Sequence, residues 1–220
     1  MVNAMRLFFL LTILLFIGAV KVLAQGKSEV CVTNHNAPPV NAYYWPPDTI
    51  VKVYFARGMF TGEQKATLLA AMKTWSDANA QTDAGISFSF AGEIDRVANC
   101  TACLTVTRRE VYKNDRKHYA FFNPLKQDGK GLLVSAWIDF DFATTKPTAL
   151  QGYMAHELGH GLGLYDCKTC KKKKTIMNGF PGINDDNGLI APSNCDLEVV
   201  RQVYQLQRRV SQNIVVEKNH

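Results

Sequence analysis

The chain has 220 residues, 47% of them hydrophobic, and a formal net charge of +6 at pH 7. This length suits one domain with a sizeable core. The charge is mild, and the two basic clusters, 108–117 and 168–174, lack the interleaved aromatic residues of a nucleic-acid platform. We therefore interpret both clusters as solvated surface and expect no nucleic-acid partner.

Residues 1–24 have the pattern of a secretory signal peptide. Arg6 gives a short positive region, residues 7–20 are almost purely apolar, and residues 22–24 offer small or compact side chains for cleavage. A membrane anchor is the alternative, but the apolar run is short for a span and is followed by Lys21. We expect a protein that is secreted, or periplasmic in a Gram-negative host, without stable membrane association after cleavage.

All six cysteines follow this segment: Cys31, Cys100, Cys103, Cys167, Cys170 and Cys195. An even number of cysteines behind an export signal favours disulfides. The two C-x-x-C pairs could each close locally, which would leave Cys31 for Cys195. The alternative is a zinc ribbon built from both pairs, although their separation is far longer than ribbon spacing.

The first third of the chain predicts an extended arm, a strand and a helix. Residues 25–48 are polar, contain four prolines and indicate an extended N-terminal arm. Residues 50–56 alternate and are β-branched, which predicts a strand. Residues 61–80 predict a helix, because Thr61 and Gln64 form a capping box. Its apolar stripe should face the core: Leu68, Leu69, Met72 and Trp75.

The middle of the chain predicts four further strands. They cover 85–92, 103–112, 118–122 and 132–142, and the third is a short candidate edge strand. Combined with the flanking helices, this order predicts an α+β fold with one sheet and the helices on one face.

The last third predicts two helices separated by a loop. Thr148 and Gln151 repeat the capping-box pattern and should open the first of them. Residues 163–192 are rich in Gly, Asn, Asp and Lys and should be loop, followed by a helix from residue 193 or 194. We expect 213–220 to be a flexible tail. The stripe of the first helix recurs every four residues: Leu150, Met154, Leu158 and Leu162.

The first of these helices contains the pattern with the strongest chemical content, H-E-x-x-H. His156 and His160 lie one turn apart on one helix face, so both imidazoles can reach one metal ion. Glu157 cannot easily join the same coordination sphere, but it can reach a water bound to the metal and act as general base.

A catalytic zinc ion usually has three protein ligands, and the sequence "HELGHGLGLYD" offers a third. Gly163 can end the helix in a left-handed conformation, and the chain can then bend back beneath the ion. Asp166 is then placed to present a carboxylate oxygen. Since Cys167 follows directly, a Cys167–Cys170 loop could brace Asp166 or turn it away. In the second case Asp185, Asp186 or water would serve.

This stretch resembles the H-E-x-x-H-x-x-G-x-x-H signature of the metzincin zinc metalloendopeptidases, with aspartate at the last position as in the snapalysin family. Its flanks look most like the matrixin branch. The resemblance implies a zincin-like catalytic domain, 49–212, with a twisted mixed sheet, an active-site helix and a C-terminal helix. It also implies that Met177, in "TIMNG", lies under the metal as a hydrophobic floor without binding it.

We therefore expect a secreted, monomeric zinc endopeptidase that takes protein or peptide substrates and uses Glu157 as general base. By family analogy, substrate would add as a strand near 119–122, and loop 179–192 would shape the pocket. Residues 184–188 could bind structural Ca²⁺, but a plain turn cluster is the better interpretation. The alternatives are a secreted zinc-binding module without proteolysis and, less compatible with export, a nucleic-acid binder.

Overall fold

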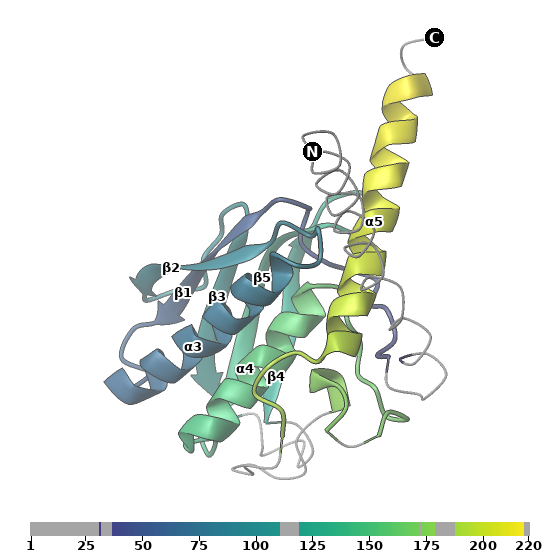
Figure 1. Cartoon of the computed structure of the whole chain (residues 1–220). Coiled ribbons are helices and arrows are strands. Elements are labelled where there is room, and N and C mark those ends of the chain that lie inside the picture. Colours follow the sequence, from purple (N-terminus) through teal and green to yellow (C-terminus); the bar gives the residue numbers. More distant parts are fainter. Residues whose placement is uncertain (1–30, 32–36, 111–118, 172, 179–187, 218–220) are drawn as a thin grey trace, which may run out of the picture.

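The computed structural model describes residues 31, 37–110, 119–171, 173–178 and 188–217 (Figure 1). The expected signal peptide 1–24, the arm before residue 37 apart from Cys31, and residues 184–187 of the candidate calcium loop 184–188 lie outside the described residues. Within the described part, no helix combines the length and apolar character that crossing a membrane requires.

A five-stranded mixed sheet forms the centre of the molecule, in the order β2-β1-β3-β5-β4. Neighbouring strands are parallel except β4, which is antiparallel to β5 and forms one edge of the sheet. The strands are β1 (Ile50–Ala56), β2 (Ser87–Ile94), β3 (Cys103–Arg109), β4 (Ala120–Gln127) and β5 (Leu133–Asp141).

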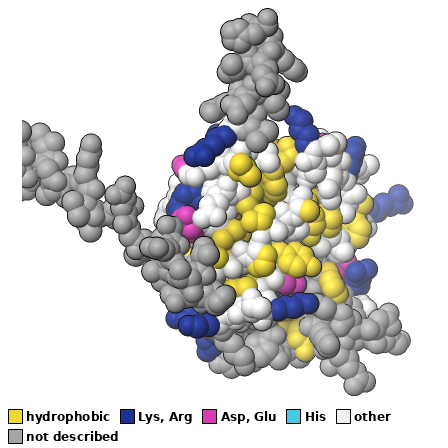
Figure 2. Space-filling model, turned by 90° about the vertical axis from the view of Figure 1, so that its right-hand side faces the viewer, with side chains coloured by type: hydrophobic (Ala, Val, Ile, Leu, Met, Phe, Trp, Pro, Cys, Tyr) yellow, Lys and Arg dark blue, Asp and Glu magenta, His cyan; other side chains and the backbone are white. Residues whose placement is uncertain are grey.

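Two helices cover one face of this sheet, and a third stands beside it (Figure 1). They are α3 (Gly62–Asn79), α4 (Pro147–Gly161) and α5 (Asn194–Glu217), with a short 3-10 turn, η2 (Ile176–Asn178), between α4 and α5. The predicted α+β class is confirmed. The face on the α5 side shows apolar side chains near its middle and single lysine or arginine side chains around its rim (Figure 2).

The core forms where α3 and α4 pack against each other and on the sheet. The capping box of Thr61 and Gln64 at the start of α3 is confirmed, since each binds the backbone N–H of the other. Trp75 is fully buried and its Nε1 donates to the carbonyl of Ala155 in α4 at 2.6 Å. The predicted stripe of α4, including Met154, is fully buried as well. These contacts fix α4 relative to the sheet.

The start of α4 differs from the prediction. The helix begins at Pro147, and Lys146 is its N-cap without a side-chain hydrogen bond, so the predicted capping box at Thr148 is wrong. Proline suits the first helical position because its φ is already helical and it needs no donor there. The preceding turn is held by buried Arg108, which donates to the carbonyls of Asp141, Phe142 and Thr144.

Other element boundaries shift by a few residues. Strand β4 extends to Gln127, beyond the predicted end at residue 122, and passes through Pro124 with a register shift. A proline is tolerated there because an edge strand has one side without ladder partners. Helix α5 reaches Glu217 and thus includes part of the expected tail 213–220.

Residues 37–48 of the arm contain no helix, and they pack against the end of α4. Three backbone hydrogen bonds join the two segments: Asn41 N–H to the Gly163 carbonyl (2.7 Å), Trp45 N–H to Gly161 (2.9 Å) and Tyr165 N–H to Pro39 (2.8 Å). Trp45 is fully buried, and its carbonyl accepts from the hydroxyl of Tyr204 in α5 at 3.0 Å. The arm therefore belongs to the folded domain.

The cysteines form three disulfides: Cys31–Cys195, Cys100–Cys103 and Cys167–Cys170. A zinc ribbon is therefore excluded. The first bond joins the arm to the start of α5 across a sequence separation of 164 residues. Each of the other two closes a short loop across a sequence separation of three residues.

We predict that Cys31→Ser/Cys195→Ser lowers the free energy of unfolding by about 3 to 5 kcal/mol, because a long loop restricts the unfolded chain most. The control, Cys100→Ser/Cys103→Ser, should cost less than about 2 kcal/mol on the same entropic argument. Urea unfolding of both variants measures the difference. Equal losses would show that the long disulfide does not restrict the unfolded chain as described.

Candidate metal centre

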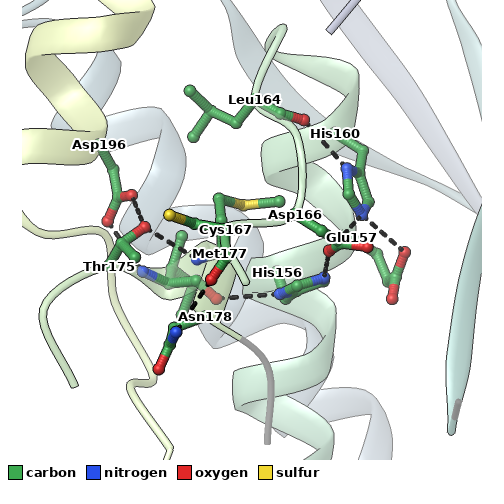
Figure 3. Close-up of polar contacts among 11 residues, drawn as sticks. His156, Glu157, His160, Leu164, Asp166, Cys167, Thr175, Met177, Asn178 and Asp196 are labelled. Carbon is green, nitrogen blue, oxygen red and sulfur yellow. Dashed lines mark hydrogen bonds and ion pairs between the residues drawn. The ribbon is translucent and has the colours of Figure 1, made fainter. Parts of the chain in front are cut away.

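Helix α4 places both histidines and the glutamate of the H-E-x-x-H pattern in the protein interior. His156 and Glu157 are 8% and 4% exposed, and the side chain of His160 is 13% exposed. The two imidazole rings lie 4.9 Å apart, nearly perpendicular at 87°. Both face the turn that follows the helix (Figure 3). One helical turn of spacing therefore brings the rings together, as its geometry requires.

Each imidazole is oriented by a backbone carbonyl. His156 Nδ1 lies 2.9 Å from the Ile176 carbonyl, and His160 Nδ1 lies 3.0 Å from the Leu164 carbonyl. A carbonyl only accepts hydrogen bonds, so each Nδ1 carries a proton, and in the neutral imidazole the lone pair is then on Nε2. Metal-binding histidines in proteins are generally held by such a hydrogen bond on the other ring nitrogen.

The turn after α4 returns the chain toward the histidines. Leu164 N–H binds the Gly159 carbonyl and Gly163 N–H binds the His160 carbonyl, the two hydrogen bonds of a Schellman motif. Gly163 has φ of 89°, and a Cβ there would lie 3.1 Å from a methyl of Val203 in α5. Glycine is thus favoured at this position by the backbone conformation, and a Cβ would in addition crowd Val203 of α5.

Asp166 points toward the histidines. Its Oδ1 lies 3.1 Å from His156 Nε2 and 3.6 Å from His160 Nε2 (Figure 3). The three donor atoms all lie within 4.8 Å of one another. Two imidazole nitrogens and one carboxylate oxygen are a donor set that suits zinc. The residues present therefore fit this metal, and the loop after Asp166 does not turn the carboxylate away.

Met177 is 1% exposed and lines the same cleft as the two histidines. It belongs to a turn, residues 175–178, that we call the methionine turn. A Cβ built on Gly159 would approach the sulfur of Met177 to 2.7 Å, so a glycine in α4 makes room for it. The packing role of Gly159 was not visible in the sequence, because nothing local marks a glycine inside a helix as a packing site.

Asp196 at the start of α5 supports the methionine turn. It is fully buried and accepts hydrogen bonds from the Thr175 hydroxyl, from Ile176 N–H (3.0 Å), and from both the N–H and the hydroxyl of Ser193 (2.7 and 2.8 Å). Burial raises the pKa of Asp196, and these hydrogen bonds act in the opposite direction. The carbonyl of Ile176, which orients His156, is thereby tied to α5.

The disulfide loop 167–170 joins Asp166 to the methionine turn. Cys167 N–H donates to the Met177 carbonyl at 2.9 Å. The amide of Asn178 donates to the carbonyls of both cysteines, Cys167 at 3.0 Å and Cys170 at 2.9 Å (Figure 3 shows Asn178 beside this segment). The disulfide loop that follows Asp166 is therefore hydrogen-bonded to the methionine turn.

The electrostatic environment of the cluster favours a cation. Burial lowers the pKa of His156, but the hydrogen bond to Asp166 and the charge of Glu157 outweigh it and raise the value to about 9. Burial and the nearby charge of His156 lower the pKa of His160 to about 4. Without a metal, the carboxylates of Asp166 and Glu157 thus favour a proton, and its positive charge, on His156 Nε2. A divalent ion between the donors would satisfy the same attraction with both histidines neutral.

The cluster lies in a cleft of about 330 Å³. Tyr119 and residues 120–122 of the edge strand β4 line it, as do residues 165–168 and Met177. Tyr43 of the arm also lines it and stacks on Phe122, with ring centroids 5.8 Å apart. Sequence reasoning missed Tyr43, because the pattern of the arm does not indicate which element it packs against.

No family model and no curated protein sequence matches the chain. Among solved structures, high choriolytic enzyme 1, a hatching-enzyme zinc protease of the medaka fish Oryzias latipes, matches at 14% identity and a TM-score of 0.43. That match covers 74% of this chain and 94% of the enzyme.

Metalloproteinase-II of Bacteroides fragilis matches at 12% identity and a TM-score of 0.44, over 79% of this chain and 59% of that one. A chain from a chaperone–substrate complex matches at 12% identity and a TM-score of 0.41. That match covers 73% of this chain and 34% of the other. This chain thus spans less than two thirds of the length of each of these last two.

We predict that Asp166→Ala weakens zinc binding by at least about a hundredfold, more than loss of an outer hydrogen-bond partner costs. Asp166→His should retain zinc, since imidazole is an equivalent ligand. Competition with a chromophoric chelator measures the affinity, and Asp77→Ala, an exposed carboxylate on α3, is the control. Full zinc affinity in Asp166→Ala would exclude Asp166 as a ligand.

We predict that Cys167→Ser/Cys170→Ser weakens zinc binding by about 10- to 100-fold, because Asp166 loses the loop that orients it. The chain offers a matched control in Cys100→Ser/Cys103→Ser, a C-x-x-C disulfide of the same span at the start of β3. The chelator competition should leave the control at the wild-type affinity. The bracing role is refuted if both double variants bind zinc alike.

Proposed function

We propose that the chain is a zinc-dependent endopeptidase of the metzincin type, with aspartate in place of the last histidine of the signature. One observation carries the proposal: the Nε2 atoms of two histidines and a carboxylate oxygen of Asp166 converge beside buried Glu157. They do so in a cleft bordered by a sheet edge. Metal binding alone would not require a buried glutamate next to the donors.

His156, His160 and Asp166 would hold the ion. When bound, zinc would supply the Lewis acidity that makes water a nucleophile near neutral pH and that stabilises the developing oxyanion. The chain itself supplies the orientation of the donors, through the carbonyls of Ile176 and Leu164. Met177 would supply an apolar part of the wall beside the ion.

Glu157 is the proposed general base. Its Oε2 lies 3.9 Å from His160 Nε2, on the same side as the donor cluster (Figure 3). From there the carboxylate can accept a proton from the attacking water and pass it to the leaving amine nitrogen. The carboxylate is held in place because α4 is packed on α3 and on the sheet.

The edge strand β4 is the proposed substrate-binding element. Among the described strands it pairs only with β5, so its outer side can bind an extended peptide by main-chain hydrogen bonds. The cleft residues 119–122 belong to or adjoin this strand, which places the peptide beside the donors. The substrates would be proteins or peptides.

We also propose that the protein is exported and acts as a monomer. The three disulfides support export, because such bonds persist in oxidising compartments. The N-terminal sequence pattern of residues 1–24 supports it independently.

We predict that Glu157→Ala keeps its zinc but lowers kcat/KM on casein or a peptide substrate by about 10²- to 10⁴-fold, the range typical of a lost general base. Zinc content and cleavage are measured on the same preparations, and Glu63→Gln, an exposed residue of α3, is the control. Unchanged cleavage by Glu157→Ala would disprove this mechanism. A zinc-loaded wild type without cleavage would favour a non-catalytic zinc-binding module.

A further inference from the structure

The wall of the cleft next to Asp166 contains a lysine. Lys168 lies between the two cysteines of the disulfide loop 167–170, is exposed, and lines the same cleft as the metal donors. Among the described residues, no ion pair joins Lys168 to a carboxylate. The ammonium group is thus available to a molecule in the cleft.

The backbone that presents this lysine is held at both ends. Cys167 and Cys170 are bonded to each other and are 3% and 7% exposed. Their carbonyls accept from Asn178, and Cys167 N–H binds Met177. A side chain on such a preorganised loop loses less conformational entropy on binding than one on a flexible loop.

Among the described residues that line the cleft, no acidic side chain is left to compensate the charge of Lys168. The acidic residues of the cleft, Glu157 and Asp166, face the histidines, and a bound divalent cation would balance both. The positive charge of Lys168 then remains at the rim. Three further lysines continue the chain from the loop and are exposed: Lys171, Lys173 and Lys174.

We propose that Lys168 is a specificity-determining residue that recognises an acidic side chain of the substrate next to the scissile bond. The substrate class would be proteins or peptides with glutamate or aspartate at one position near the cleaved bond. Lysines 171, 173 and 174 would extend the attraction to acidic residues farther along the substrate. This inference rests on the proposed peptidase function and deepens it.

The experiment uses quenched fluorescent peptides built on one sequence that the wild-type protein cleaves. One residue at a time, on either side of the scissile bond, is made Glu, Gln or Lys. We expect one position where kcat/KM is about fivefold higher for Glu than for Gln, as an exposed ion pair of about 1 kcal/mol would give. Raising salt from 0.1 to 1 M shortens the screening length from about 10 to about 3 Å and should reduce this preference.

Charge reversal identifies the residue. Lys168→Glu should prefer Lys over Gln at the same position, and Lys168→Gln should show no charge preference. The control Lys52→Glu carries the same change in net charge on β1 and should keep the wild-type preference. All variants should retain zinc, which shows that the centre is intact.

The outcomes separate this inference from the proposed function. A wild type that cleaves peptides but has no Glu preference overturns the role of Lys168 alone. A preference that persists in Lys168→Glu, or that is undiminished in 1 M salt, overturns it as well. A zinc-loaded wild type that cleaves no peptide overturns both.

Discussion

The hydrogen bonds between the histidine Nδ1 atoms and two backbone carbonyls are the contacts on which the candidate centre depends. One carbonyl, that of Ile176, belongs to the methionine turn, and the other, that of Leu164, belongs to the turn that ends α4. Each bond fixes a ring and its tautomer at once. Because the carbonyls come from outside the helix, the helix alone cannot orient its own histidines.

Those carbonyls are held in turn by segments far away in the sequence. Asp196 of α5 fixes the backbone at Ile176, and the arm hydrogen-bonds to Gly161 and Gly163 on either side of the helix end. The centre is thus a local motif supported by both ends of the described chain. Its geometry is a property of the whole domain, although its donors span only eleven residues, 156–166.

The sequence predicted most of what is set by local pattern. The α+β class, the strand at 50–56 and the capping box of Thr61 were readable because alternation and capping act over a few residues. The spacing of His156, His160 and Gly163 likewise predicted that the two histidines share a helix face and that the helix ends at the glycine. At Thr148 the same capping rule failed, because proline at the first helical position and Arg108, distant in sequence, define the start of α4. Tyr43, Gly159 and Asp196 were missed for the same reason: their roles arise from contacts between segments that no spacing rule connects.

The support from α5 has a consequence for biosynthesis. A nascent chain that has been made only as far as residue 190 already contains all three donors and Glu157, but it lacks Asp196, Val203 and Tyr204. Its methionine turn and its arm then lack the partners that hold them in the complete fold. The geometry of the centre can therefore form only after almost the whole chain has been synthesised. An incomplete chain would contain the motif without the contacts that position its donors.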